Sequence, residues 1–190
     1  MRALLLPSLA CLSLILSGCS AVNSAHPLYT SEDAVQEPAL VGTWISDDKD
    51  MPEFVFQKSD GNAYNMVLTD EESKTVYVYE VHLVRLEDQT FMDIVFRKQT
   101  VNGTEAGEAL GVVAHHVIAK VEVNQNDLAY AVLDPDAVEK QNATGYLPFE
   151  FVKDGDTMLI TSPTEVMREY FSTHSGLVFS DFEHLTRKAE

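Results

Sequence analysis

The sequence predicts a mainly β protein in which antiparallel strands follow one another along the chain as a meander. From Val41 onward, apolar and polar residues alternate with a period of two in most segments, which is typical of half-buried strands. Short runs rich in Asp, Gly and Asn separate these segments and indicate tight turns. Only two segments, residues 135–141 and 163–174, have the pattern of helices.

The first expected pair of strands is a hairpin. Phe54 and Phe56 share one face of segment 53–58, and segment 63–69 alternates in the same way. Between them, the sequence Ser-Asp-Gly-Asn at 59–62 has the composition of a turn. The pattern therefore predicts two neighbouring antiparallel strands.

The alternation continues through the rest of the chain. Strand 75–86 carries apolar residues on both faces, which predicts a wall covered on both sides. A glycine-containing loop is expected at 99–111, and the pair Asp134-Pro135 introduces the short helix. The further expected strands are residues 90–97, 112–123, 128–133, 149–153 and 157–161.

The second helix has a complete start signal. Ser162 is the expected N-cap, Pro163 occupies the first helical position, and Glu165 lies three residues after the cap. Gly176 is expected to end the helix. The pattern predicts a helix over residues 163–174.

The N-terminus has the order of a secretory signal. Arg2 precedes an apolar run that ends at Leu16, and two small residues lead into Cys19. The run is too short to span a bilayer, which needs about 20 apolar residues. This stretch resembles the lipobox of bacterial lipoproteins, which implies cleavage after residue 18 and acylation of Cys19. The alternative is an ordinary signal peptide cut near Ala21 or Ala25.

The lipoprotein resemblance implies where the mature chain lies. Residues 1–18 are the expected signal peptide, and residues 19–40, which are polar and lack periodicity, are the expected lipidated tether. Two or three acyl chains give stable membrane attachment. Ser20 follows the cysteine where aspartate favours the inner membrane in lipoproteins, so the resemblance implies the outer membrane of a bacterial envelope, on its periplasmic face or the cell surface.

Composition excludes several function classes. Removal of residues 1–18 leaves 172 residues, enough for one domain, and takes the formal net charge from −17 to −18 because only Arg2 is lost. Such a charge repels phosphate backbones and argues against a nucleic-acid partner. Both cysteines precede residue 20, so the mature domain has no disulfide and depends on its core.

Gly42 and Trp44 open the first expected strand. Here the chain resembles the lipocalins and related calycins, whose first strand begins with glycine, any residue and tryptophan, and whose antiparallel strands close a β-barrel. The resemblance implies that Arg187 packs across the tryptophan ring, a contact of about 0.5–2 kcal/mol. Residues 41–190 would then form one lipocalin-like barrel domain. With its lipobox and its leader His-Pro-Leu-Tyr-Thr, the chain also resembles a group of uncharacterised bacterial lipoproteins.

Three tyrosines are candidates for a pocket inside the barrel. Tyr77 and Tyr79 share one face of strand 75–86, and Tyr64 lies on the preceding strand. A barrel of this size either holds one small ligand or is filled by its own side chains. Both arrangements use the same residue types.

Other polar residues suggest structure rather than catalysis. Asp93 lies in an apolar run and is expected to pair with Arg85 or, after a register shift of one residue, with His82. His115 and His116 are adjacent and point to opposite faces of a strand, so they do not share a metal. The sequence contains no hydrolase elbow and no phosphate loop. We therefore expect no enzyme activity, no metal and no cofactor.

The sequence favours two functions. The first is a lipid-anchored envelope protein that binds a small apolar ligand in its barrel. The second is an envelope interaction protein with a packed barrel and an unidentified protein partner. A hydrolase is the third hypothesis.

Overall fold

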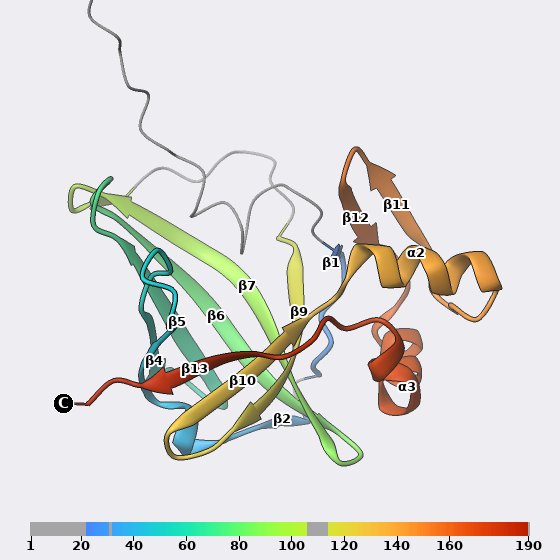
Figure 1. Cartoon of the computed structure of the whole chain (residues 1–190), viewed down its shortest axis with the longest axis horizontal. Helices are drawn as coiled ribbons and strands as arrows, with labels where there is room; N and C mark the ends of the chain where they lie inside the picture. Colours follow the sequence, from blue (N-terminus) through green and yellow to red (C-terminus); the bar gives the residue numbers. More distant parts are fainter. Residues whose placement is uncertain (1–21, 31, 106–113, 190) are drawn as a thin grey trace, which may run out of the picture.

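The computed structural model describes residues 22–30, 32–105 and 114–189, and its main feature is a closed barrel of eight antiparallel strands (Figure 1). The predicted mainly β fold is therefore confirmed. Each barrel strand pairs with the next in chain order, and the last pairs with the first. The barrel strands are β3 (Gly42–Ile45), β4 (Phe54–Lys58), β5 (Ala63–Asp70), β6 (Thr75–Leu86), β7 (Gln89–Val101), β9 (His116–Val123), β10 (Asp127–Val132) and β13 (Glu183–Arg187).

The remaining elements lie outside the barrel wall. They are β1 (Val22–Ser24), β2 (Ala34–Val35), η1 (Pro38–Leu40), β8 (Thr104–Glu105), α2 (Pro135–Thr144), β11 (Phe151–Asp154), β12 (Thr157–Ile160), α3 (Thr164–His174) and η2 (Ser175–Leu177). The expected strands at 149–153 and 157–161 exist as the hairpin β11–β12, but this hairpin pairs with β1 rather than continuing the barrel. The chain leaves the wall after β10 and returns to it as β13.

The expected loop at 99–111 is wrong in its first residues. Strand β7 runs on to Val101, because its partner β6 extends equally far and pairs Thr75 with Val101. Residues 104–105 then return as β8. Residues 106–111 of that expected loop lie outside the described residues.

The two predicted helices are present, but α3 starts differently from the prediction. Pro163 is its N-cap and no side chain caps it. The Ser162 hydroxyl accepts a hydrogen bond from the backbone N–H of Glu150 (2.7 Å). It is therefore not the cap of the helix. Gly176 lies in the 3-10 turn η2 that follows α3, so it is not a left-handed helix end. Tertiary hydrogen bonding has thus overridden a local capping signal.

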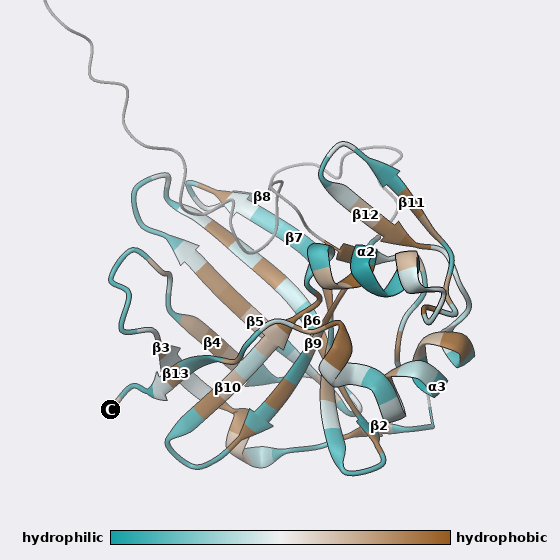
Figure 2. Ribbon diagram, turned by 45° about the vertical axis from the view of Figure 1, so that its right-hand side comes forward, coloured by the Kyte–Doolittle hydropathy of each residue, from teal (hydrophilic) through white to brown (hydrophobic). Residues whose placement is uncertain are grey.

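The core has two parts, one on each side of the barrel wall. Tyr79, Val81 and Leu83 of β6 belong to the cluster inside the barrel. Val84 and Leu86 of the same strand belong to an outer cluster beneath α3. The predicted coverage of strand 75–86 on both faces is confirmed, and Figure 2 shows apolar residues alternating along the barrel strands. Each Å² of buried apolar surface contributes about 25 cal/mol, so both clusters stabilise the fold.

Residues 22–30 and 32–40, which we call the strap, correct the expected tether. β1 pairs with β9 and β12, and β2 pairs with β6. Leu28 and Leu40 are completely buried. The strap folds because its apolar side chains join both parts of the core: Leu28 packs in the outer cluster and Leu40 in the inner one. Burying them offsets the entropy of ordering the chain.

The strap also defines the two ends of the barrel. Its C-terminal part, with η1, lies at the end that carries the β6–β7 and β9–β10 turns, which we call the closed end (Figure 1). The opposite end carries the β5–β6 turn and the start of β9, and we call it the open end. Within the described part of the chain, no helix combines the length and apolar character needed to cross a membrane.

Candidate functional site

Trp44 plugs the closed end of the barrel. Its ring is completely buried, and its indole N–H donates a hydrogen bond to the Leu40 carbonyl oxygen (2.8 Å). The Arg187 guanidinium lies over the ring, with its central carbon 4.2 Å from the ring centroid. The contact implied by the lipocalin resemblance is therefore present.

Arg187 binds two backbone segments at this plug, residues 39–41 and the β9–β10 turn. Its guanidinium donates to the carbonyl oxygens of Ala39, Val41 (2.8 Å) and Gln125. Gly42 makes room for it, because its φ is 141° and a Cβ there would overlap the guanidinium. All of these contacts stabilise the closed end of the barrel. The motif formed by Gly42, Trp44 and Arg187 is therefore structural.

The three candidate pocket tyrosines do not form one pocket. Tyr64 and Tyr79 are 3% and 4% exposed, and both pack within the inner cluster. The Tyr64 hydroxyl accepts the N–H of Glu37 (2.7 Å) and donates to its carbonyl (3.1 Å), which ties the strap to the wall. Burial raises the pKa of Tyr64 and of Tyr79. Only Tyr77 is partly exposed.

The inner side chains at the open end are less buried than those at the closed end. Five of them, which we call the open-end set, are partly or largely exposed: Tyr77, Ile94, Phe96, Tyr130 and Val132. Phe96 pairs with Tyr79 across the strands and packs edge-on against its ring (5.6 Å between centroids), yet it is 46% exposed. The barrel is thus filled at its closed end and presents apolar side chains at its open end.

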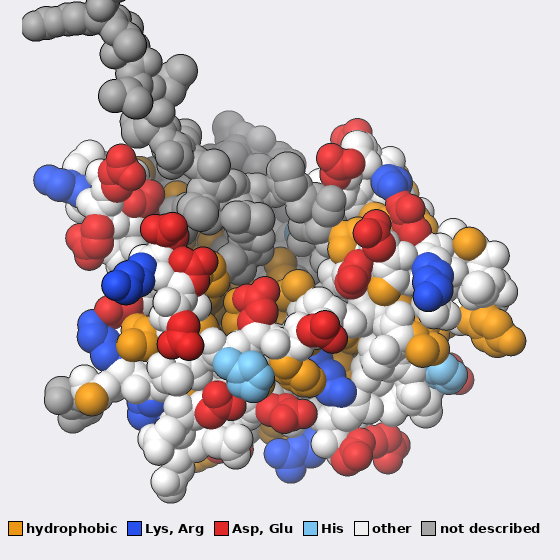
Figure 3. All heavy atoms as spheres, in the orientation of Figure 1, with side chains coloured by type: hydrophobic (Ala, Val, Ile, Leu, Met, Phe, Trp, Pro, Cys, Tyr) orange, Lys and Arg blue, Asp and Glu red, His pale blue; other side chains and the backbone are white. Residues whose placement is uncertain are grey.

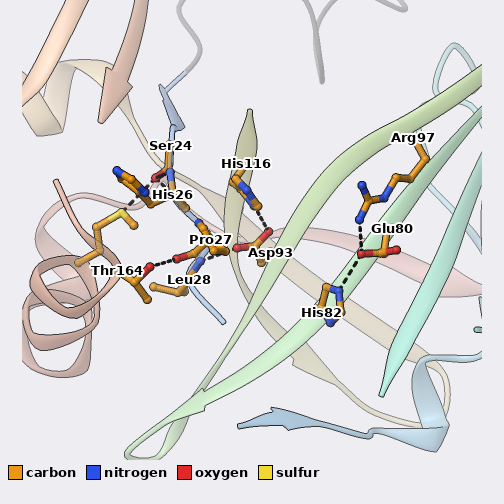
Figure 4. Close-up of polar contacts among 11 residues, drawn as sticks. Ser24, His26, Pro27, Leu28, Glu80, His82, Asp93, Arg97, His116 and Thr164 are labelled. Carbon is orange, nitrogen blue, oxygen red and sulfur yellow. Dashed lines mark hydrogen bonds and ion pairs between the residues drawn. The ribbon is translucent and has the colours of Figure 1, made fainter. Parts of the chain in front are cut away.

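The outer wall carries a buried carboxylate beneath the strap (Figure 4). Asp93 is completely buried; its carboxylate accepts the backbone N–H of Leu28 (2.5 Å) and contacts Nδ1 of His116 (2.6 Å). The register places His82 opposite Asp93, as one of the two expected alternatives required. Neither expected partner binds it, because the strap and β9 supply closer groups. A structural role is what these contacts indicate.

A second polar group lies beside it on the same wall. Glu80 binds both Nε2 of His82 (2.9 Å) and the Arg97 guanidinium (2.5 Å), as Figure 4 shows. The ring of Tyr29 stacks on His82, with centroids 3.7 Å apart. Partial burial acts to raise the pKa of Glu80, but the hydrogen bonds from Arg97 and His82 outweigh it and hold that pKa below its ordinary value.

The lowered pKa of Glu80 predicts an acid-sensitive contribution to stability. A carboxyl group whose folded-state pKa is depressed stabilises the fold above its unfolded-state pKa and loses that effect as the pH falls through the folded-state value. Glu80→Gln should therefore lower the urea midpoint at pH 7 and flatten its decline below about pH 4.5. Glu71→Gln, in an exposed turn, is the matched control and should leave both unchanged. Equal acid sensitivity of Glu80→Gln and the wild type would contradict this assignment.

The residues considered for metal binding and for lipid attachment lie apart from these two polar groups or outside the described ranges, His116 excepted. No group of three or more His, Cys, Asp or Glu side chains in the described ranges is arranged to hold a metal ion. His115 is exposed and precedes β9, whereas His116 binds Asp93. Cys19, the expected lipid attachment site, lies outside the described residues.

A polar groove of about 660 Å³ opens at the closed end, between β2, the β6–β7 turn and η2. Arg85 and Lys120 line it together with Glu37 and Ser175. The sequence did not reveal this groove, because its residues come from four distant segments. The importance of Leu28 was also missed; the apolar pair Leu28-Tyr29 within a polar leader was the available signal.

The chain was compared with known proteins at the level of families, sequences and structures. No protein-family model, curated protein or solved structure was found to match it.

Proposed function

We propose that this chain is a lipid-anchored protein of the bacterial envelope whose barrel binds a small apolar ligand at its open end. The lipobox-like stretch before Cys19 supports the anchor. The closed barrel of eight strands supports ligand binding, since barrels of this size hold one small molecule when their interior is not filled. The proposal assigns no reaction to the protein.

The observation that carries this proposal is the change in burial along the barrel. At the closed end, Leu40, Trp44 and Leu83 are completely buried, which leaves no room for a ligand there. The open-end set faces inward and remains partly exposed. Its aromatic and aliphatic side chains suit an apolar molecule, which would gain about 25 cal/mol for each Å² of apolar surface that it covers.

A second function is favoured by a different observation. Tyr64 and Tyr79 are buried inside the barrel, while Val152 of β11, the outermost strand of the sheet within the described residues, is 59% exposed. An exposed strand edge with apolar neighbours is a site at which another protein adds a strand. In this alternative the barrel is a rigid support and the protein partner binds at β11.

Native mass spectrometry of the intact chain, purified from its own cell envelope, tests ligand binding. The proposal predicts an extra mass that is reproducible and disappears on denaturation. Ile94→Trp, which fills the open end, should lose that mass, whereas Val152→Trp on the outer hairpin should retain it. A chain with no extra mass, or with one that Ile94→Trp leaves in place, would move the assignment to the packed barrel and its protein partner.

The anchor is tested in the same preparation. The wild type should incorporate labelled palmitate and sediment with membranes, and Cys19→Ala should do neither. Membrane retention of Cys19→Ala would contradict acylation at this residue without affecting the test of the ligand.

A further inference from the structure

The strap runs along the outer wall from the open end of the barrel to the closed end. Ser24 pairs with His116 at the start of β9, and Leu28 binds Asp93 further along the wall. Ala34 then pairs with Val84, and Glu37 binds the Tyr64 hydroxyl near the closed end. Strand β1, which begins at Val22, therefore lies beside the start of β9 at the open end, where Figure 1 labels it.

The strap is held firmly along this course. Ser24 and Leu28 are completely buried. The Thr164 hydroxyl of α3 donates to the carbonyl of Pro27 (2.6 Å), and Arg168 of the same helix donates to that of Leu28 (3.0 Å). The first residue of β1 is consequently a fixed point on the barrel rather than the end of a loose tether.

Only three peptide units separate Cys19 from Val22. A fully extended chain advances at most about 3.5 Å per residue, so the Cα atom of Cys19 stays within about 10 Å of Val22 whatever path the chain takes. This distance is shorter than the barrel, whose strand β6 alone has 12 residues.

We propose that this short link holds the open end of the barrel against the lipid surface, with the closed end pointing away from it. The inference rests on the acylation of Cys19 proposed above. The partner of the open-end rim is the bilayer that carries the anchor, and the open-end set then lies next to that bilayer. A ligand reaches these side chains from the membrane without crossing bulk water.

The acidic rim offers no attraction to anionic lipids, so the covalent link is what would set this orientation. Exposed acidic residues gather in the turns of the open end: Asp47, Asp48, Asp50, Glu71, Glu72 and Glu105. Figure 3 shows acidic side chains outnumbering basic ones on the visible face. They repel anionic lipids by about 1 kcal/mol per charge near the surface, an effect that decays within about 8 Å at physiological salt. The membrane attachment that two or three acyl chains provide is stronger than this repulsion.

Single-cysteine labelling tests the orientation, since residues 20–190 contain no cysteine. Glu72→Cys places a fluorophore in the β5–β6 turn at the open end, and Gln125→Cys places it in the β9–β10 turn at the closed end. Each acylated protein is reconstituted into vesicles of phosphatidylethanolamine and phosphatidylglycerol that contain an acceptor-labelled lipid. We expect several-fold greater energy transfer from position 72 than from position 125. Equal transfer, or greater transfer from position 125, would overturn the inference.

A spacer variant serves as the control. Twelve Gly and Ser residues inserted between Ser20 and Ala21 keep the acylated cysteine but extend the flexible link to a typical span of about 20 Å. The difference between the two positions should then shrink toward zero. If it persists, the rim itself binds lipid and the short link is not the cause.

Failure of the proposed function gives a different result from failure of this inference. If Cys19 is not acylated, neither labelled protein sediments with the vesicles and neither shows transfer. If Cys19 is acylated and the inference is wrong, both proteins sediment but the order of transfer is lost. The two outcomes are therefore read from separate measurements.

Discussion

Trp44→Ala should lower the free energy of unfolding by about 3–5 kcal/mol, because it removes a completely buried indole from the closed end. The change also deprives the Leu40 carbonyl of its donor and the Arg187 guanidinium of the ring beneath it. Urea unfolding followed by circular dichroism measures the loss, since the chain has no other tryptophan for fluorescence.

Trp44→Phe is the matched control for this prediction. Phenylalanine keeps an aromatic ring under Arg187 but has no N–H for Leu40, so we expect a loss of only about 1–2 kcal/mol. An unchanged urea midpoint in Trp44→Ala would show that the ring does not plug the barrel, and would remove the basis for the lipocalin resemblance.

Asp93→Ala should release the strap from the outer wall and cost about 3–5 kcal/mol. The substitution leaves the buried N–H of Leu28 without its acceptor and His116 without its carboxylate. Hydrogen exchange at the Leu28 amide should accelerate by at least two orders of magnitude, while amides of β5 and β6 keep most of their protection. Limited proteolysis should then cut within residues 22–40.

Asp93→Asn separates the two contacts of this carboxylate. Its amide oxygen still accepts from Leu28, so strap protection should be largely retained, and only the charge next to His116 is lost. Unchanged exchange at Leu28 in Asp93→Ala would show that the strap is held elsewhere, for example through Thr164 and Arg168 of α3.

Release of the strap should also change how the barrel is oriented at the membrane. Because the strap fixes Val22 at the open end, a protein with a detached strap has a longer effective link to Cys19. In the vesicle experiment Asp93→Ala should therefore behave like the spacer variant, provided that the barrel itself remains folded.

The parts of the fold that local sequence predicts are those whose signal lies in neighbouring residues. The hairpin of β4 and β5, the bounds of β6 and the presence of α2 and α3 follow from periodicity, turn composition and helix signals. The same local reasoning failed at Ser162, whose hydroxyl binds Glu150 instead of capping α3. A competing tertiary acceptor or donor leaves no trace in the local pattern.

The contacts of the candidate site likewise include some that the sequence predicted and others that it did not. Gly42 and Trp44 were recognisable as a motif, and the ring contact of Arg187 followed from a resemblance. The partners of Asp93 were not predictable, because Leu28 lies 65 residues away and His116 lies 23 residues away along the chain. Likewise, the equal burial of Tyr64 and Tyr79 and the exposure of Phe96 depend on which end of the barrel each side chain reaches.

By itself the sequence determined the mainly β character with two helices, the apolar coverage of both faces of β6 and the absence of cysteine after residue 19, because these depend on residue type and short-range period. Only the tertiary structure decided that β13 closes the barrel against β3, that the hairpin β11–β12 stays outside it, and that residues 22–30 and 32–40 form a strap. These features depend on contacts between residues far apart in the chain. Their free energy comes from burial and hydrogen bonds that exist only once the whole barrel has assembled.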